Sequence, residues 1–437
     1  MDSCGGSIRD DFKVFLPDVN FREYLTQEYN IEFIKGYVAL GEIRKIKFIH
    51  CVNRKIQSLE GIQYFTALTD LHCYDNQLRS LDVSKNTALA VLHCGSNQLT
   101  SLDVTKNLAL TRLYCMYNLL LGLDVTKNGI LKTLSCRENR LTNLDLTNNA
   151  ALTVLDCAEN QLTSLDLTSN AALTLFYCNN NQLISLDVTK CLALPKLKCC
   201  NNRLTSIDVT KNAILTRLEC YDNQLISLDV SKNAALTDLN CSNNQLIRLD
   251  VSKNAALTDL NCSNNQLTSL DVSNNAAITG LSCSNNQLTS LDVMFNDDLK
   301  NLQCADNQLT NLNIRINYSL DSLICSGNLL TSLDITKNKG LTVLFCNGNQ
   351  LSSLDVTNNT LLNLLVCSNN QLTSLDISTN IALGEFNCSN NQLTDLDVTN
   401  NTDLGELRCY GNQLPSLNLS NNAELYRIEQ VSPFKCN

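Results

Sequence analysis

The feature that most constrains this chain is a repeat of 21 residues. Seventeen cysteines, from Cys73 to Cys409, each stand 21 residues from the last. An asparagine follows three residues after every one of them, and a leucine follows two residues later still. A fixed period of this length is typical of solenoids, in which each unit is one supersecondary element that stacks on its neighbours. We therefore expect the 437 residues to form one stack of coils and not several globular domains.

Each unit divides into two similar halves. Residues 257–275 read LTDLNCSNNQLTSLDVSNN, and both halves follow the pattern LxxLxLxxNxL, with cysteine in the third apolar slot of the first half. Successive side chains of an extended segment point to opposite sides, so Leu260 and Cys262 should face inward while Asp259 and Asn261 face outward. We predict two short strand-like segments per coil, each followed by an asparagine turn.

These registers favour an α/β-type repeat solenoid. We expect a right-handed leucine-rich coil with stacked parallel strands, mostly β and turn, behind a short helical N-terminal cap. The two asparagine registers should donate to and accept from backbone groups at the turns, because those groups would otherwise be buried unpaired. Cys191 replaces the second asparagine in one coil, which indicates either a local irregularity or a functional thiol.

The cysteine column predicts buried, reduced thiols. A zinc site needs converging ligands, whereas these thiols stand in line with no histidine at matching depth. Coils about 4.8 Å apart also hold neighbouring Cβ atoms further apart than the roughly 3.8 Å of a disulfide. Cys200, directly after a ladder cysteine, is expected to point outward and is the candidate for a reactive thiol.

Fifteen aspartates between Asp82 and Asp397 share a single outward register, with asparagine at positions 313 and 418. We interpret this register as a solvated polar stripe, and a low-affinity cation ladder is the alternative. The same register accounts for the acidic balance of 43 Asp and Glu against 33 Lys and Arg. An acidic chain is a poor match for nucleic acid, which needs basic surface to neutralise phosphates.

The sequence unit LxxLxCxxNxLxxLDVxxN resembles the 21-residue cysteine-ladder repeats of internalin J-like bacterial leucine-rich-repeat surface proteins. The resemblance implies a secreted or surface-attached protein that binds a ligand on a neighbouring cell. Residues 15–25 resemble the helical cap segment of such proteins. Residues 31–42 resemble a degenerate EF-hand loop, in which Ile31, Phe33 and Lys35 cannot bind calcium.

We expect three parts: an N-terminal cap at residues 1–45, the solenoid at 46–431, and a C-terminal tail at 432–437. No run approaches the roughly 18 apolar residues of a membrane helix. Residues 1–6 have neither the charged nor the apolar region of a signal peptide, and Cys4 before two glycines is a weak lipoprotein signal. A secreted or cell-surface protein numbered without its leader is expected, with a cytoplasmic protein as the alternative.

Binding information should reside in the outward registers that vary from coil to coil. Five apolar side chains on three successive coils form the first candidate surface, because exposed apolar patches mark interaction sites. They are Ile324, Val343, Phe345, Leu364 and Val366. A contact with the chain's own end is an alternative reading. The central coils, at residues 240–284, have small polar residues in these registers and are predicted to be spacer.

The second candidate surface is an aromatic cluster on the N-terminal coils. Aromatic side chains on a repeat surface are typical anchors for protein or glycan partners. The cluster consists of His72, Tyr74, His93, Tyr114, Met116 and Tyr117. Its two stacked histidines lack a third metal ligand, so we expect no metal site.

The preferred function is a non-enzymatic scaffold for adhesion or for protein or glycan recognition through the variable outward face. A purely structural spacer or self-assembling solenoid is the alternative. Three histidines in the whole chain, and no second domain, leave no catalytic constellation, so we expect no enzyme activity and no cofactor. The expected partner is a protein or carbohydrate, with no nucleic acid and a monomeric chain favoured.

Overall fold

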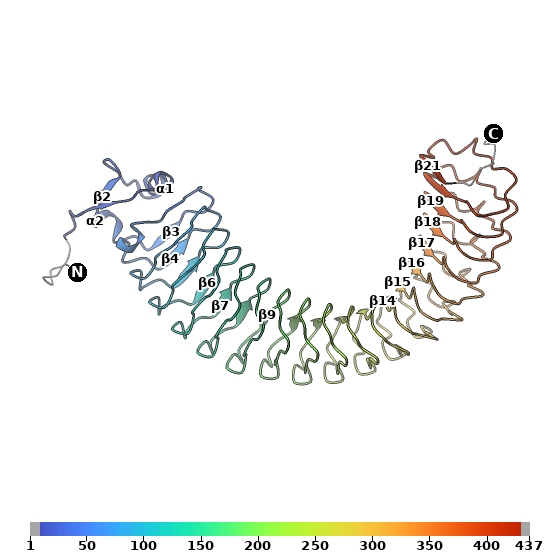
Figure 1. Ribbon diagram of the computed structural model, residues 1–437, viewed down its shortest axis with the longest axis horizontal. Coiled ribbons are helices and arrows are strands. Elements are labelled where there is room, and N and C mark those ends of the chain that lie inside the picture. Colours follow the sequence, from blue (N-terminus) through green and yellow to red (C-terminus); the bar gives the residue numbers. More distant parts are fainter. Residues whose placement is uncertain (1–8, 430–437) are drawn as a thin grey trace. The chain divides into compact units, whose positions relative to one another are not determined.

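The structure of the chain is a computed structural model that describes residues 9–429. It contains two compact units, Met1–Leu215 and Thr216–Asn437, and each is described by itself. Both consist of coils with one short strand each (Figure 1). Cys4 and the expected C-terminal tail lie outside the described residues.

The first unit begins with four cap elements and continues with coils. The cap elements are β1 (Lys13–Phe15), α1 (Val19–Tyr29), β2 (Tyr37–Ala39) and α2 (Leu40–Ile43). The coils contribute β3 (Phe48–His50), the 3-10 helix η1 (Ile62–Tyr64), β4 (Asp70–His72), β5 (Val91–His93), β6 (Arg112–Tyr114), β7 (Thr133–Ser135), β8 (Val154–Asp156), β9 (Leu175–Tyr177) and β10 (Lys196–Lys198).

The second unit consists of coils throughout its described part. Its strands are β11 (Arg217–Glu219), β12 (Asp238–Asn240), β13 (Asp259–Asn261), β14 (Gly280–Ser282), β15 (Asn301–Gln303), β16 (Ser322–Ile324), β17 (Val343–Phe345), β18 (Leu364–Val366), β19 (Glu385–Asn387), β20 (Glu406–Arg408) and β21 (Arg427–Glu429).

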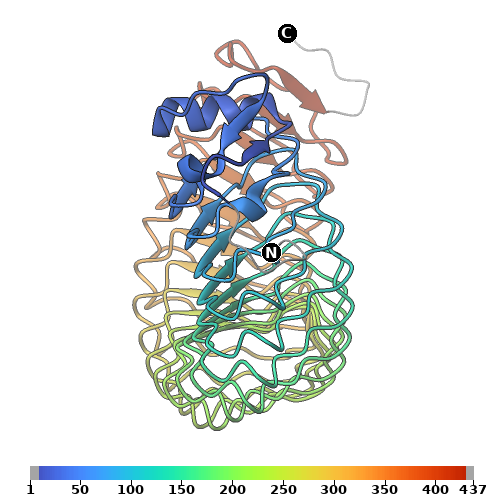
Figure 2. The same cartoon turned by 90° about the vertical axis from the view of Figure 1, so that its left-hand side faces the viewer.

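Helix α1 packs against the first coils of its unit (Figure 2). Asp18 caps its N-terminus by accepting a hydrogen bond from the backbone N–H of Phe21 at 3.0 Å. The helix ends at Asn30, whose left-handed φ of 54° is a conformation that asparagine tolerates. On its buried side, the hydroxyl oxygen of Tyr24 accepts a 2.7 Å hydrogen bond from the backbone N–H of His50 in β3. The sequence did not predict that β1 and β2 pair as a small antiparallel sheet beside this helix.

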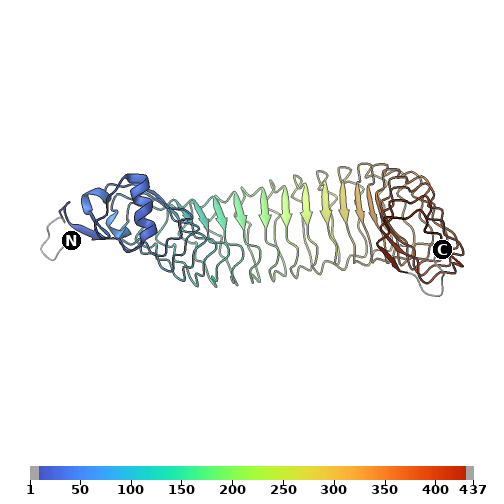
Figure 3. The ribbon, with the colours of Figure 1, turned by 90° about the horizontal axis from the view of Figure 1, so that it is seen from above.

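The strands of the coils within each unit run parallel and pair in register, so that equivalent residues of successive coils lie side by side (Figure 3). In the second unit, for example, Leu260 of β13 pairs with Leu281 of β14. Both of these middle residues are buried. Each strand is three residues long, and alternation places its middle residue in the core. Because the strands pair in register, these middle residues form one continuous inward row.

The first asparagine register holds neighbouring coils together as expected. The side-chain amide of Asn265 donates to the carbonyl oxygens of Cys241 and Cys262 at 3.1 and 3.0 Å. Its Oδ1 atom accepts a 3.0 Å hydrogen bond from the backbone N–H of Leu246 in the previous coil. Backbone groups that the three-residue strands leave unpaired are thereby satisfied.

The second asparagine register donates but does not accept, which corrects half of the expectation. The amide of Asn254 donates to the carbonyl oxygens of Val230 and Asn233 at 3.0 and 2.8 Å, while its buried Oδ1 atom accepts no hydrogen bond within the described chain. Carbonyl groups converge at this turn, so the position selects a donor. Cys191 keeps one such bond, from its thiol to the carbonyl oxygen of Asn170 at 3.8 Å. The exception is thus a local irregularity of the ladder.

The second half of each coil is not a strand, contrary to our prediction. Across the described residues it forms only isolated bridges, such as that between Asp271 and Asp292. The register of aspartates explains this difference, because each carboxylate binds the backbone two residues later and turns the chain. No helix among residues 9–429 is long and apolar enough to cross a membrane.

The cysteines form a buried thiol ladder. Every cysteine from Cys51 to Cys409 is buried, and burial raises the pKa of Cys94 and of Cys262 to about 12. The expectation that Cys200 points outward is wrong, since its side chain is 0% exposed. The chain leaves the strand at this register and turns inward, as the buried Ala158 and Ser242 at equivalent positions show.

Candidate ligand-binding surfaces

The first and third residues of every strand point away from the core and form two rows along each sheet. Because the pairing is in register, each row presents one side chain per coil. The core, the asparagine ladders and the thiol ladder occupy other registers. The predicted apolar surface lies entirely on the two outward rows, whereas the aromatic cluster lies on them only in part, because Tyr74, Met116 and Tyr117 follow their strands.

The structure brings all five residues of the predicted apolar surface together on β16 to β18. We call Ile324, Val343, Phe345, Leu364 and Val366 the apolar patch. Phe345 pairs with Ile324 on one side and with Val366 on the other, while Val343 pairs with Leu364 in the parallel row. All five side chains are partly exposed, in contrast to the middle leucines of the same strands. The patch is thus a compact surface that no described part of the chain covers fully.

The predicted aromatic cluster is a continuous stack of rings in the first unit. His93 is its centre, with ring centroids 4.2 Å from Tyr74, 5.1 Å from Tyr114 and 5.8 Å from His72. His50 extends the stack, 4.4 Å from His72, and was missed by the sequence analysis. The signal was available, because Cys51 follows His50 as Cys73 follows His72, with a spacing of 22 residues.

Met116 and Tyr117 lie at the margin of this cluster. Met116 is partly buried over Gly95, where an added Cβ atom would meet the methionine sulfur at 2.9 Å. Tyr117 follows in the turn with a left-handed φ of 57°, and its side chain is 45% exposed. The structure therefore places these two residues beside the ring stack rather than within it.

The histidines of the cluster are held in the neutral form. Burial, together with the charge of His72, lowers the pKa of His93 to about 4. Burial and the charge of His50 lower the pKa of His72, while Asp70 acts weakly in the opposite direction. Neutral imidazole rings can stack on tyrosine without bringing charge into the stack. Within residues 9–429, no group of three or more His, Cys, Asp or Glu side chains is placed to hold a metal ion.

The aspartate register has a local structural role. Thr105 donates to the Oδ1 atom of Asp103 from both its backbone N–H and its hydroxyl, at 2.8 and 2.7 Å. These two hydrogen bonds lower the pKa of Asp103. The same arrangement recurs at Asp334, where a hydrogen bond from Arg315 adds to it and the pKa falls to about 2. Each carboxylate thus stabilises its own turn.

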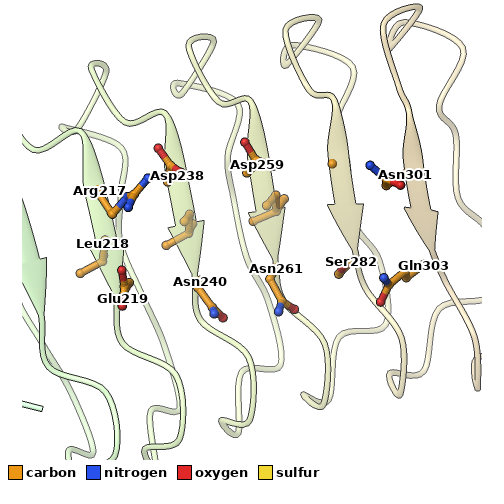
Figure 4. A pocket seen from close by; sticks show the side chains of 13 residues that line it. Arg217, Leu218, Glu219, Asp238, Asn240, Asp259, Asn261, Ser282, Asn301 and Gln303 are labelled. Atoms are coloured by element: carbon orange, nitrogen blue, oxygen red, sulfur yellow. Dashed lines mark hydrogen bonds and ion pairs between the residues drawn. The ribbon is translucent and has the colours of Figure 1, made fainter. Parts of the chain in front are cut away.

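The sequence does not predict a third surface, which covers the expected spacer at residues 240–284 and extends beyond it on both sides. A hollow of about 520 Å³ spans β11 to β15 in the second unit (Figure 4). Asp238, Asp259, Asn240 and Asn261 line it, with the two aspartates at one end of their strands and the two asparagines at the other (Figure 4). Its origin is the small size of the side chains in both rows here, and small side chains gave no positive signal in the sequence.

Comparisons with known proteins show which solved structures share this coil architecture. No protein-family model and no curated protein matches the sequence. Among solved structures, the chain is similar to the functional domain of InlJ from Listeria monocytogenes, which includes a cysteine ladder. The two are 31% identical over 90% of this chain and 84% of that one, with a TM-score of 0.73.

Two further bacterial structures share the fold at lower identity. YopM from Yersinia enterocolitica is 23% identical over 90% of this chain and 92% of its own, with a TM-score of 0.68. A leucine-rich-repeat protein of Leptospira interrogans is 22% identical over 89% and 97%, with a TM-score of 0.63. The expected leucine-rich solenoid of parallel strands is confirmed.

Proposed function

Because this chain belongs to the leucine-rich-repeat proteins with a cysteine ladder, the family of the InlJ domain, we propose that it is a non-enzymatic scaffold that binds a protein ligand through its strand face. Its frame is the same from coil to coil, while the two outward rows differ. A rigid frame with variable outward rows supports binding, because the rows can change without loss of the core. Among solved structures with this fold is a plant peptide hormone receptor in complex with RGF2, although at 20% identity it shares the fold alone.

The apolar patch is the observation that carries this proposal. Its five side chains are partly exposed although polar residues occupy most of the two outward rows elsewhere in the second unit. The core beneath is already filled by Leu323, Leu344 and Leu365, each 0% exposed, so the patch is not needed to complete it. Contiguous apolar surface rimmed by polar residues is typical of protein interaction sites.

We propose further that the protein acts outside the cytoplasm, in adhesion or cell-surface recognition. The thiol ladder supports this location, since thiols that are buried and kept protonated react slowly with oxidants. Such a ladder can persist where exposed cysteines would be oxidised. A glycan ligand is the competing version of the proposal, and the aromatic cluster is the surface that would favour it.

The test is a binding screen of the full chain against protein and glycan arrays, beside a Phe345→Asp, Val366→Asp double variant. The matched control is Ser322→Asp, Asn387→Asp, which adds the same charge at polar positions next to the patch. We expect a protein hit that the control retains and the patch variant loses by at least about 100-fold, since a desolvated carboxylate in an apolar interface costs several kcal/mol.

Other results would move the binding site to a different surface or overturn the proposed function. A hit that the patch variant keeps would remove the patch from the site, and a His93→Ala, Tyr114→Ala variant would then test the aromatic cluster. Glycan hits alone would overturn the protein ligand. No hit at all from folded protein would overturn the binding function and favour a structural spacer.

A further inference from the structure

The hollow on β11 to β15 lies directly beside the apolar patch on the same sheet. Gln303 at one end of the hollow pairs in register with Ile324 at the near edge of the patch. From β12 to β17, the outward rows begin with carboxylates and amides on β12 and β13, continue with small and amide side chains on β14 and β15, and end with mainly aliphatic and aromatic side chains on β16 and β17. One face of the second unit therefore presents three chemistries in a fixed sequence.

Asp259 is the acidic group that the hollow makes available. The neighbouring Asp238 accepts a 3.0 Å hydrogen bond from the guanidinium of Arg217, which neutralises its charge. Asp259 is exposed and accepts only a 2.9 Å hydrogen bond from the hydroxyl of Thr258, and within residues 9–429 no basic side chain forms an ion pair with it.

Gly280 keeps this carboxylate open to the hollow. It follows Asp259 in the outward row and is followed by Asn301. A Cβ atom at Gly280 would lie 2.8 Å from the Oδ1 atom of Asp259. Any larger residue would therefore cover the acid and fill the floor of the hollow, whereas glycine leaves room for a ligand group to approach.

We propose that the hollow and the apolar patch together bind one extended peptide, with a basic side chain of the peptide at Asp259 and an apolar side chain at Phe345. This inference rests on the proposed function and names its ligand class. A peptide matches all three chemistries: an ammonium or guanidinium for the acid, backbone amides for Asn261 and Asn301, and aliphatic groups for the patch. An oligosaccharide would leave the four aliphatic side chains of the patch unused.

The geometry also sets the spacing within the peptide. Asp259 on β13 and Phe345 on β17 are four strand steps apart along the sheet. Four steps of about 4.8 Å, together with about 6.6 Å along the strand between the first and third residues, place them about 20 Å apart, and an extended chain rises about 3.3 Å per residue. The basic and apolar side chains should therefore be about six residues apart in the ligand.

The experiment selects peptides from a phage-displayed library of random linear dodecapeptides on the immobilised full chain. We expect enriched sequences with Lys or Arg about six residues from a Leu, Ile or Phe. A synthetic enriched peptide and its counterpart with the basic residue changed to Gln are then titrated by fluorescence anisotropy. The proteins are the unaltered chain, Asp259→Asn, Gly280→Val, Phe345→Asp and the control Asp250→Asn, which removes an equal charge in the aspartate register.

The inference requires that Asp259→Asn and Gly280→Val each lower the affinity for the basic peptide by about tenfold, as expected for the loss of one charge-assisted contact. Asp250→Asn should change nothing, and the Gln counterpart should not respond to Asp259→Asn. Peptides that lose binding to Phe345→Asp but are indifferent to Asp259→Asn would overturn the inference and leave the proposed function standing. A glycan whose binding depends on Asp259 would also overturn it, and circular dichroism of each variant separates these outcomes from misfolding.

Discussion

The two units share one hydrogen-bonded frame but depart from the repeat in different places. The residue before each first-register asparagine has a left-handed φ, and in the second unit it is always Asn, Asp or Gly. In the first unit, four coils have other residues at this position, namely Ser96, Tyr117, Glu138 and Glu159, which adopt this conformation at a cost. Cys191, the exception in the second asparagine register, and all three histidines of the chain also belong to the first unit.

This difference separates frame from function. In the second unit, the left-handed turn position is always Asn, Asp or Gly, so the hollow and the apolar patch lie on a frame that is unstrained at these turns. In the first unit, the aromatic cluster adjoins coils whose turns are themselves irregular, and strained backbone often accompanies functional sites. We therefore expect equivalent changes to affect the stability of the two units equally where their frames are the same, and unequally where their frames differ.

The largest expected effect tests the shared frame. Asn139→Ala in the first unit and Asn265→Ala in the second each remove a buried amide that joins two coils. We expect each to lower the free energy of unfolding by about 3 kcal/mol, because it leaves buried backbone groups unpaired. Urea unfolding followed by circular dichroism, with hydrogen exchange to locate the change, measures this. Gln266→Ala, on the exposed side, should have no effect, and a large difference between the two asparagine variants would break the idea of one common frame.

The second-largest expected effect distinguishes the two units by the pH dependence of their stability. The folded pKa of His93, about 4, lies below the unfolded value of 6.5, so its contribution is complete above pH 6.5 and is lost as pH falls toward 4. Allowing for solvent at the half-buried ring, we expect a loss on the order of 1–2 kcal/mol in the first unit. The second unit, which has no histidine, should show no change over this window. Hydrogen exchange at pH 7 and 4.5 compares the units, and an unchanged slope in His93→Gln would refute the assignment.

A smaller effect concerns the ladder exception. Cys191→Asn should restore the second donor bond, to the carbonyl oxygen of Leu167, that asparagine makes at this register in other coils. We expect a gain of about 1 kcal/mol in unfolding free energy, the usual net value of one hydrogen bond. The reverse change in the second unit, Asn254→Cys, should cost a similar amount. Thermal unfolding measures both, and a loss from Cys191→Asn would indicate that the surrounding coil has adapted to the thiol.

The smallest expected effect comes from exchanging glutamate and asparagine at the positions with a left-handed φ. Glu138→Asn should raise the unfolding free energy by about 0.5–1 kcal/mol, because asparagine tolerates a positive φ, and Asn264→Glu should lower it by the same amount. Both side chains are exposed, so packing changes little. Paired urea titrations of the two variants suffice. Equal signs for the two changes would mean that the turns of the units are not equivalent.

The repeat made the frame predictable from the sequence, while the surface was predictable only where side chains are large. The spacing of Cys73 and its successors determines which residues face inward, and rows of apolar or aromatic residues such as Phe345 and His93 stand out from a polar background. The hollow at Gly280 could not be found in this way, because a cavity arises from side chains that are small relative to their neighbours in space. The inward turn at Cys200 was missed because simple alternation does not reveal where a strand ends.

Each coil is hydrogen-bonded only to the coils next to it, and this has an evolutionary consequence. Residues 236–256 and 257–277 differ at only three positions, so their coding segments are close to direct repeats, which are prone to unequal recombination. A duplicated coil would enter the stack without rupturing the frame, since each unit contacts only its neighbours. Each such event would add an aspartate and an asparagine to the hollow and about 4.8 Å to its length, and leave the apolar patch as it was. A lineage could thereby lengthen its binding surface one coil at a time.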